Sequence, residues 1–152
     1  MPTIRKARFG DLDAIMGLVR EFARKELMLP LSVGDTVERL RDFWVAEGED
    51  GKIVGCAALH VTWIGLMEIR SVAVREADQK TGVARRLVET ALDEARSFGA
   101  SSVFVLTYVP GFFARFGFRE VERDALPQKV WQDCTKCPKY PDCGEIAMAM
   151  AL

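Results

Sequence analysis

The chain has 152 residues, of which 49% are hydrophobic and 28% are charged, and its formal net charge at pH 7 is −1. This size and balance are typical of a globular protein, and we expect residues 1–152 to form a single domain. The small net charge predicts no general affinity for nucleic acid or for membranes. No apolar run is long enough to span a bilayer and the N-terminus lacks an apolar signal segment, so a cytoplasmic location is expected.

The N-terminal part begins with one strand and two helical segments. Residues 3–8 alternate as a strand, and Asp11 is placed to cap a helix whose apolar residues recur at helical spacing as far as Ala23. Pro30 closes that region, and residues 33–43 are predicted to form a second helix.

Three strands then follow in succession. Residues 43–47 and 52–61 are strand-like, and the Asp50-Gly51 pair between them is a hairpin turn signal. Residues 66–74 form the next predicted strand. We therefore expect an antiparallel hairpin at the start of this region.

The C-terminal part contains one long helix and several strands. An apolar stripe runs from Gly82 to Phe98, and Gly99 is placed to end that helix. The elements expected after it are a buried strand, a short helix stopped by Gly117, a strand, an irregular stretch and a last strand, at 102–108, 110–117, 118–122, 124–144 and 145–152. A helical crossover usually makes its flanking strands parallel. The expected fold is α/β (α+β), a mixed sheet flanked by helices.

A polar run, QKTG at residues 79–82, leads directly into the long helix. A helix N-terminus presents unpaired N–H groups and a positive dipole end, so it binds anions that can come close. Gly82 has no Cβ and Ala84 is small, while Lys80, Arg85 and Arg86 add positive charge. The alternative is a glycine that merely begins a helix with solvated arginines. Neither GxxxxGK[ST] nor GxGxxG is present, which excludes those two phosphate loops.

Two motifs resemble those of a known superfamily. SVAVREADQKTGVARRLVETALDEA resembles motif A of the GNAT superfamily of acetyl-CoA-dependent N-acetyltransferases, whose pattern [QR]-x-x-G-x-[GA] is matched by Gln79, Gly82 and Ala84. GFFARFGFREV resembles the second motif, a short helix that ends at Gly117-Phe118. The resemblance spans nearly the whole chain and implies the GNAT fold, with a mostly antiparallel sheet and acetyl-CoA as co-substrate.

The same resemblance implies where acetyl-CoA binds. Backbone groups at the end of the 66–74 strand would bind the pantetheine arm, and the glycine turn would cradle the pyrophosphate. The implied residues are Val72, Ala73, Val74, Gln79, Lys80, Thr81, Gly82, Val83, Ala84 and Arg85.

Acetyl transfer to an amine needs a base, because most amines are protonated at neutral pH. Glu68 is the candidate, and strand alternation places it on one face with Arg70 and Val72. The opposite face is predicted to carry Met67, Ile69, Ser71 and Ala73. A structural ion pair between Glu68 and Arg70 is the alternative, but an acid at this position often acts as the base in the family that the chain resembles.

The general acid is a separate question. GNAT enzymes often carry a tyrosine four residues before the Gly-Phe of the second motif, where this chain has Phe113, so Tyr108 is the candidate instead. A tyrosine at the edge of the core, or a proton from water or from the substrate, is the alternative. His60 is interpreted as a packed histidine with one hydrogen bond and only secondarily as a base. Cys56 is interpreted as a buried, inert thiol rather than an acyl-enzyme nucleophile.

The acceptor is suggested by a closer resemblance. LPQKVWQDCTKCPKYPDC, with EIRSVAV and VLTY, resembles the short bacterial N-acetylglutamate synthases of arginine biosynthesis, which implies glutamate as acceptor and glutamine as a second one. Arg70, Arg115 and Lys129 match basic positions expected near the acceptor, and arginine suits carboxylates. Arg115 and Lys129 can also be solvated surface charges. Related sequences carry an arginine where this chain has Leu31, which weakens the glutamate assignment.

Three cysteines near the C-terminus allow two interpretations. Cys134, Cys137 and Cys143 with a fourth ligand could bind a structural zinc. Only one CxxC pair is present and the single histidine lies far away, so we expect an ordered loop of reduced thiols and no metal. An iron–sulfur site ranks third.

The predicted function is transfer of acetyl from acetyl-CoA to an amino-acid α-amine, foremost that of L-glutamate. The alternatives are a GNAT enzyme for another small amine, or a non-catalytic module that binds acetyl-CoA or zinc. Only a catalyst needs Glu68 and Arg70. The sequence leaves open whether the chain forms a homodimer.

Overall fold

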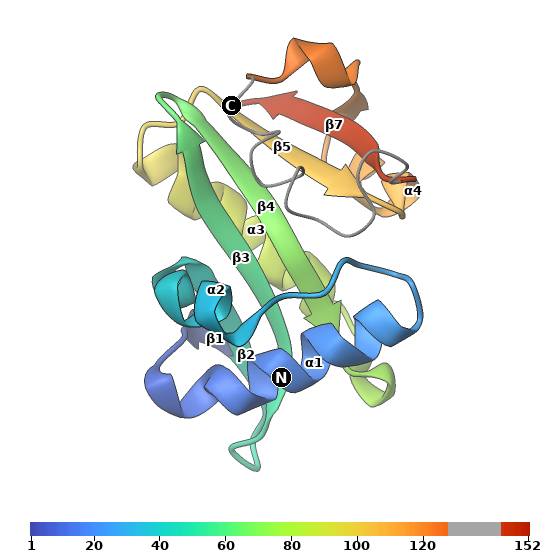
Figure 1. Ribbon diagram of the computed structural model, residues 1–152. Helices are drawn as coiled ribbons and strands as arrows, with labels where there is room; N and C mark the ends of the chain where they lie inside the picture. The colour runs from blue at the N-terminus through green and yellow to red at the C-terminus, as the bar shows by residue number, and fades with distance from the viewer. Residues whose placement is uncertain (128–143) are drawn as a thin grey trace.

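The computed structural model describes residues 1–127 and 144–152, and these form a seven-stranded sheet flanked by helices (Figure 1). The strands are β1 (Thr3–Lys6), β2 (Phe43–Glu47), β3 (Ile53–Trp63), β4 (Leu66–Val74), β5 (Ser102–Thr107), β6 (Arg119–Glu120) and β7 (Ile146–Ala151). Their order is β1-β2-β3-β4-β5-β7-β6, and β4 with β5 is the one parallel pair among the described strands. The mixed, mostly antiparallel sheet predicted from the sequence is confirmed.

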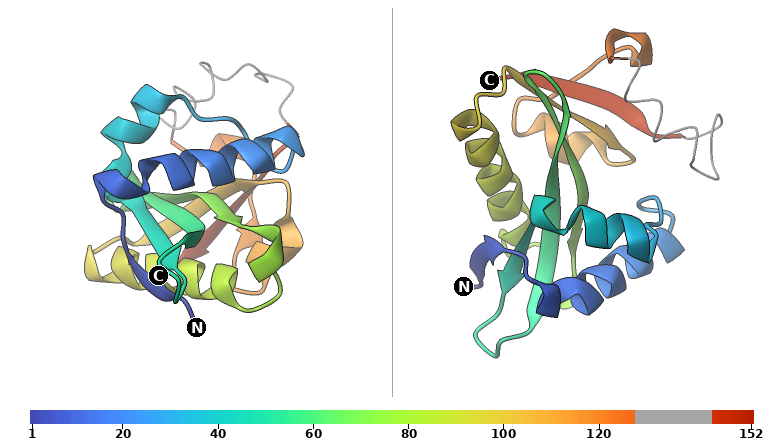
Figure 2. Two further views of the ribbon diagram at one scale, coloured as in Figure 1. Left: turned by 90° about the horizontal axis from the view of Figure 1, so that it is seen from below. Right: turned by 60° about the vertical axis from the view of Figure 1, so that its left-hand side comes forward.

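In the described part of the chain, four α-helices cover the two faces of the sheet. They are α1 (Leu12–Arg24), α2 (Val33–Glu38), α3 (Val83–Ser97) and α4 (Pro110–Ala114). Figure 2 shows α1 and α3 on opposite sides of the strands. No helix within the described ranges combines the length and apolar character needed to cross a membrane.

Each face has its own hydrophobic cluster. Ile15 and Val19 of α1 pack with Cys56, Ala58 and Ala73 on one face. On the other face, α3 packs against β3, β4 and β5 through the six stripe residues expected from the sequence, which are Val83, Leu87, Val88, Ala91, Leu92 and Ala95. All six are buried, so the long amphipathic helix is confirmed.

The predicted helix over 33–43 is shorter than expected. Ser32 caps α2 by accepting the backbone N–H of Asp35 at 3.1 Å, but α2 ends at Glu38. A tight 3₁₀ turn over Leu40–Asp42 follows, and Phe43 already belongs to β2. The break falls at Arg39, whose backbone leaves helical geometry at φ −105° and ψ 14°.

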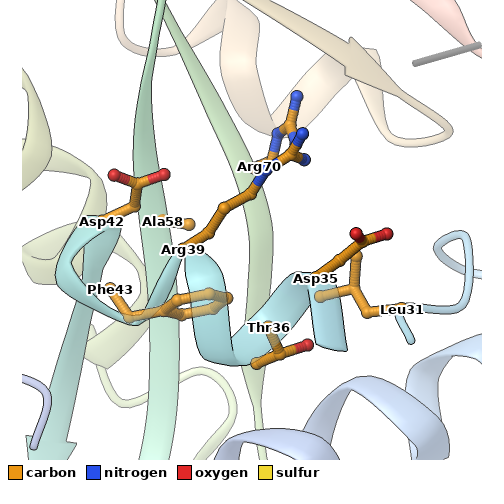
Figure 3. Close-up of a pocket in the computed structure, with 8 residues that line it drawn as sticks. All are labelled: Leu31, Asp35, Thr36, Arg39, Asp42, Phe43, Ala58 and Arg70. Carbon is orange, nitrogen blue, oxygen red and sulfur yellow. The ribbon is translucent and has the colours of Figure 1, made fainter. Parts of the chain in front are cut away.

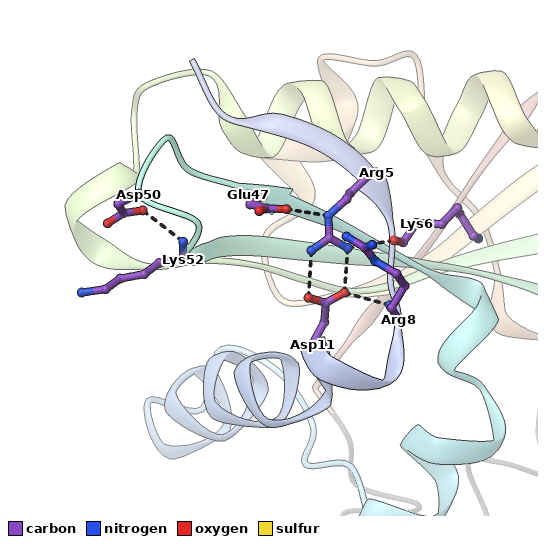
Figure 4. A network of polar contacts seen from close by, with 7 residues as sticks. All are labelled: Arg5, Lys6, Arg8, Asp11, Glu47, Asp50 and Lys52. Carbon is purple, nitrogen blue, oxygen red and sulfur yellow. Dashed lines mark hydrogen bonds and ion pairs between the residues drawn. The ribbon is translucent and has the colours of Figure 1, made fainter.

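Asp11 precedes α1, as predicted, but its carboxylate does not cap that helix. It binds Arg5 through two hydrogen bonds of 2.7 and 3.0 Å and accepts the backbone N–H of Arg8 at 2.8 Å (Figure 4). Arg5 also donates to Glu47 of β2 at 2.6 Å. The bonds from Arg5 hold the pKa of the Asp11 carboxyl below its usual value, so this network ties β1, β2 and the start of α1 together.

A β-bulge in β4 changes which side chains share a face. Cys56 of β3 pairs with Ala73, but Ala58 pairs with Arg70, so β4 carries one extra residue between these pairs. Ser71 lies at the extra position with a φ of +57°. The predicted alternation is therefore wrong beyond Arg70.

The bulge exchanges the faces of the residues that follow it. Val72 packs with the α3 clusters, and Ala73 packs with α1. Glu68 and Arg70 thus keep the face that we predicted, whereas Val72 has left it. A bulge commonly re-aims side chains and interrupts pairing beside a functional site.

Candidate active site

The site is built where β4 and β5 separate. Their ladder joins only Leu66–Glu68 to Ser102–Phe104, whereas β4 pairs with β3 as far as Val74. In Figure 1 the two strands diverge beyond that ladder. The later part of β4 therefore has backbone groups that no described residue of β5 pairs, and such groups can bind an extended ligand as an added strand.

The chain then passes through a loop with a 3₁₀ turn, Glu76–Asp78, and enters the N-terminus of α3. Gln79 donates from its side-chain amide to the carbonyl oxygen of Val74 at 3.0 Å, which fixes the loop to the end of β4. Val74 and Val83 share a hydrophobic cluster, so the open end of β4 and the start of α3 lie together. The unpaired backbone groups of β4 and the positive end of the α3 dipole consequently lie close to one another.

Gly82 adopts a conformation that favours glycine. Its φ is +90°, and Lys80 before it also has a positive φ of 63°. A Cβ built on Gly82 would meet no atom within 4 Å, so the backbone of this turn can be approached closely. The first N–H groups of α3 have no partner within the helix, which makes the turn a site for an anion.

The cationic side chains near this turn differ in their exposure and in their partners. Lys80 is exposed, and the exposed Arg85 pairs with Glu89 at 2.8 Å. Arg86 donates to the carbonyl oxygen of Pro2 at 2.7 Å and so lies beside the start of β1. An exposed ion pair is weak, so Arg85 can exchange Glu89 for a phosphate at little cost.

Glu68 and Arg70 lie at the apex of the opening. Glu68 is only 7% exposed and is the last β4 residue paired with β5. The guanidinium of Arg70 donates to its Oε1 from Nε at 3.1 Å and from a terminal nitrogen as well. The carboxylate is therefore oriented by Arg70 and shielded from bulk water.

Two neighbours of this pair match their sequence interpretations. His60 pairs with Glu68 across β3 and β4, and its Nδ1 lies 2.7 Å from Oδ2 of Asp42. Cys56 is fully buried, and burial raises the pKa of its thiol to about 12. The predicted burial of Cys56 is confirmed, and a thiol whose pKa is raised in this way is a poor nucleophile.

A small cavity adjoins Arg70 on the face that also carries Glu68. Its walls are Leu31, Asp35, Thr36, Arg39, Asp42, Phe43, Ala58 and Arg70 (Figure 3). Sequence reasoning singled out Arg70 and Leu31 but missed Arg39. Arg39 follows the buried Thr36 by three residues and precedes the buried Leu40, a position at the edge of the buried side of α2 that could have signalled it.

Tyr108 directly follows β5. It lies four residues beyond Phe104, the residue that pairs with Glu68, so it is at the level of the bulge across the opening. Its ring is half-buried beside Gly144. Phe113 is buried and packs edge-to-face on Phe118 at 5.6 Å, so α4 supplies no polar group at that position.

Other predicted residues lie elsewhere. Arg115 is exposed at the end of α4, a helix that packs on the α3 face, and it does not line the cavity with Arg70. Lys129, Cys134, Cys137 and Cys143 fall outside the described residues. Within the described ranges no group of three or more His, Cys, Asp or Glu is placed to hold a metal.

Comparison with known proteins agrees with this architecture. The family model "Acetyltransferase (GNAT) family" matches residues 15–118. An uncharacterized N-acetyltransferase of Chlorobaculum tepidum is 43% identical over 98% of this chain and 96% of its own length. An amino-acid acetyltransferase of Mycobacterium tuberculosis is 42% identical over 91% of this chain and 79% of its own length.

Two solved structures are also similar over the whole chain. A Mycobacterium tuberculosis protein solved in complex with CoA has a TM-score of 0.85 at 36% identity, covering 99% of both chains. N-acetylglutamate synthase from Neisseria gonorrhoeae, solved with coenzyme A and N-acetyl-glutamate, has a TM-score of 0.90 at 27% identity. This chain covers 35% of that longer protein. The sequence, the splayed strands and these matches agree: the chain belongs to the acetyltransferase (GNAT) family.

Proposed function

We propose that the protein transfers the acetyl group of acetyl-CoA to the α-amine of an amino acid, with L-glutamate as the principal acceptor. The observation that carries this proposal is the layout of β4. Its open end meets the glycine turn at Gly82, and its other end holds the Glu68–Arg70 pair at the apex of the opening. A donor and an acceptor can therefore meet along one strand.

Acetyl-CoA lies along this strand in the proposal. Its pyrophosphate binds the turn from Gln79 to Arg85, where the helix N-terminus and Gly82 favour a close anion. Its pantetheine amides pair with the backbone of Val72–Val74, in the part of β4 that β5 leaves unpaired. The CoA complexes of the two solved neighbours support this donor.

The direction of the donor brings the thioester toward Glu68. Glu68 removes a proton from the acceptor ammonium, and the neutral nitrogen attacks the thioester carbonyl carbon. A backbone N–H at the bulge can stabilise the oxyanion of the tetrahedral intermediate. The C–S bond then breaks and Tyr108 gives the departing thiolate its proton. The acylated nitrogen releases its second proton, which restores the Tyr108 phenol, and Glu68 passes the first proton to solvent. No covalent enzyme intermediate is required.

The acceptor enters from the α1–α2 face, where the cavity adjoins Arg70. The partly buried guanidinium of Arg70 favours a substrate that carries a carboxylate near its amine. The relatives named amino-acid acetyltransferase and the synthase solved with N-acetyl-glutamate support an amino acid and, more narrowly, glutamate. Arg115 and Lys129 remain predicted acceptor contacts.

The test is release of coenzyme A from acetyl-CoA with a panel of acceptors at one fixed donor concentration. We expect the highest kcat/KM with L-glutamate and measurable turnover with L-glutamine, because the apolar Leu31 leaves part of the cavity wall uncharged. Lysine, polyamines and aminoglycosides should react poorly, since a cationic tail would meet Arg70. An Arg115→Gln variant assayed in parallel should show a raised KM for L-glutamate if Arg115 contacts it. Preference for a polyamine or an aminoglycoside would exclude the amino-acid assignment.

A further inference from the structure

We propose that His60 carries the proton of Glu68 to solvent after each acetyl transfer, while Asp42 holds the imidazole ring of His60 in place. This inference rests on the proposed function, in which Glu68 takes a proton from the acceptor ammonium. It assigns the route by which Glu68 becomes a base again. It follows from the way these three side chains are placed across the sheet.

Asp42, His60 and Glu68 form a row across neighbouring strands. Asp42 ends the 3₁₀ turn that leads into β2, and its Oδ2 lies 2.7 Å from Nδ1 of His60. His60 of β3 lies directly opposite Glu68 of β4. Side chains that are directly opposite in an antiparallel pair share a face, with Cβ atoms about 4.5–5.5 Å apart. Because β3 lies between β2 and β4, His60 stands between the two carboxyl groups.

The contact with Asp42 orients the imidazole ring. An ionised carboxylate only accepts hydrogen bonds, so Nδ1 of His60 carries the hydrogen and donates it to Asp42. The second nitrogen, Nε2, lies on the opposite side of the ring and is directed away from Asp42. In the row this is the side of Glu68. Nε2 keeps a lone pair on that side, and this lone pair can take a proton.

The three side chains differ in their access to water. The side chain of Glu68 is 9% exposed, whereas those of His60 and Asp42 are 24% and 25% exposed. A shielded carboxylic acid releases its proton slowly to bulk water, and an imidazole ring can accept and release one near neutral pH. Arg70 also contacts Glu68, but a guanidinium group has no acceptor for a proton. His60 is therefore suited to connect Glu68 with solvent.

The relay moves one proton in two steps. After acetyl transfer, the carboxylic acid of Glu68 gives its proton to Nε2 of His60, directly or through one bridging water. This step leaves a Glu68 carboxylate and an imidazolium, whose charge Asp42 stabilises. Nε2 then gives the proton to bulk water, and the ring is neutral again with Nδ1 still bonded to Asp42. His60 acts on the reaction only through Glu68.

The contact between Asp42 and His60 would equally serve as an anchor between the 3₁₀ turn and β3, and kinetics separate the two roles. His60→Gln keeps an N–H that can donate to Asp42 but accepts no proton. It should lower kcat by on the order of 10²-fold and leave KM for L-glutamate and for acetyl-CoA nearly unchanged. Val61→Ala, at the next and exposed position of β3, is the control and should keep the parental kcat.

A second readout is rescue of His60→Ala by a free base. Imidazole added to this variant should restore part of the lost kcat and should saturate, because it can occupy the space of the missing ring. Pyrazole has the same ring shape but is a far weaker base, so it should restore none. An anchor would be restored by neither compound, or by both to the same degree.

A third readout needs no change at His60. This residue is the single histidine of the chain, so nitrogen NMR of the tag-free protein reports its tautomer directly. At a pH where the ring is neutral, the proton should be on Nδ1 in the parent and should be shared between both nitrogens in Asp42→Asn. Arg41→Gln, at an exposed position of the same turn, is the control and should keep the parental tautomer.

A proton on Nε2 in the parent, a parental kcat in His60→Gln, or no selective rescue by imidazole would each overturn the relay. Failure of the proposed function gives a different result, because the parent would then acetylate no amino acid. A parent that acetylates L-glutamate, with His60 variants that keep the parental kcat, would reject the role of His60 alone.

Discussion

Nε of Arg70 donates to Oε1 of Glu68 at 3.1 Å, at the point along β4 where its pairing with β5 ends. The same contact would serve a purely structural ion pair, and its position distinguishes the two roles. A structural pair has no need to lie at the apex of an opening between strands, whereas a base must face the space where the substrates meet. The first prediction separates these roles.

Glu68→Gln keeps the shape of the side chain and an acceptor oxygen for Arg70, but it cannot remove a proton. We expect kcat to fall by on the order of 10²- to 10⁴-fold, with the affinity for coenzyme A nearly unchanged. Glu120→Gln, at an exposed position in β6, is the control. The measurements are kcat against pH and coenzyme A binding by calorimetry. A variant with the parental kcat and pH profile would return Glu68 to a structural role.

Tyr108→Phe tests the proton donor to the thiolate. Tyr108 lies across the opening from the bulge, and the backbone N–H of Val109 after it is bonded to Oγ1 of Thr107 at 2.9 Å, which fixes the local turn. The variant should lower kcat by on the order of 10²-fold, because the thiolate loses its proton donor. An unchanged kcat would mean that water or the substrate protonates the thiolate.

Gly82→Ala tests the pyrophosphate site, and Gly99→Ala is an unusually close control. The two glycines flank α3, have φ values of +90° and +87°, and would each place a Cβ in open space. Both variants should lose about 1–2 kcal/mol of stability from the left-handed backbone. Only Gly82→Ala should also weaken coenzyme A binding, and Gly82→Asp should weaken it further. Equal binding by Gly82→Ala and Gly99→Ala would place the pyrophosphate elsewhere.

Asp11→Asn tests the network around Arg5 through the pH dependence of stability. The pKa of Asp11 is lower in the folded state than in the unfolded state, first because of the hydrogen bonds from Arg5. The folded state therefore gains stability above the unfolded pKa of about 4 and loses it as the pH falls through the folded pKa. At pH 7 the variant should lose on the order of 2 kcal/mol, because it breaks charged hydrogen bonds.

Urea unfolding at pH 7 and at pH 3 checks this prediction, with the exposed Asp13→Asn as the comparison. The deficit of Asp11→Asn should shrink at the lower pH. A deficit that is the same at both pH values would show that the substitution acts through packing rather than through the charge of Asp11.

The sequence by itself determined most of the elements and their order, although the helix expected over 33–43 is shorter in the structure. Helical and strand periodicities indicate which residues face a core, and they depend only on residues that are close in the sequence. The stripe from Val83 to Ala95 and the alternation up to Arg70 were therefore predicted correctly. The turn at Gly82 and the common face of Glu68 and Arg70 could also be predicted, because each depends on residues close together in the chain.

Only the tertiary structure decided the features that depend on pairing between distant segments. The bulge at Ser71 lies where the register between β3 and β4 shifts, and beyond it Val72 is on the opposite face. The break at Arg39 arises where the chain leaves α2 to enter β2, and it brings Arg39 to the cavity with Arg70. Strand alternation and helix propensity depend only on neighbouring residues and do not describe pairing between distant segments. The walls of the cavity beside Arg70 could therefore be known only from the folded chain.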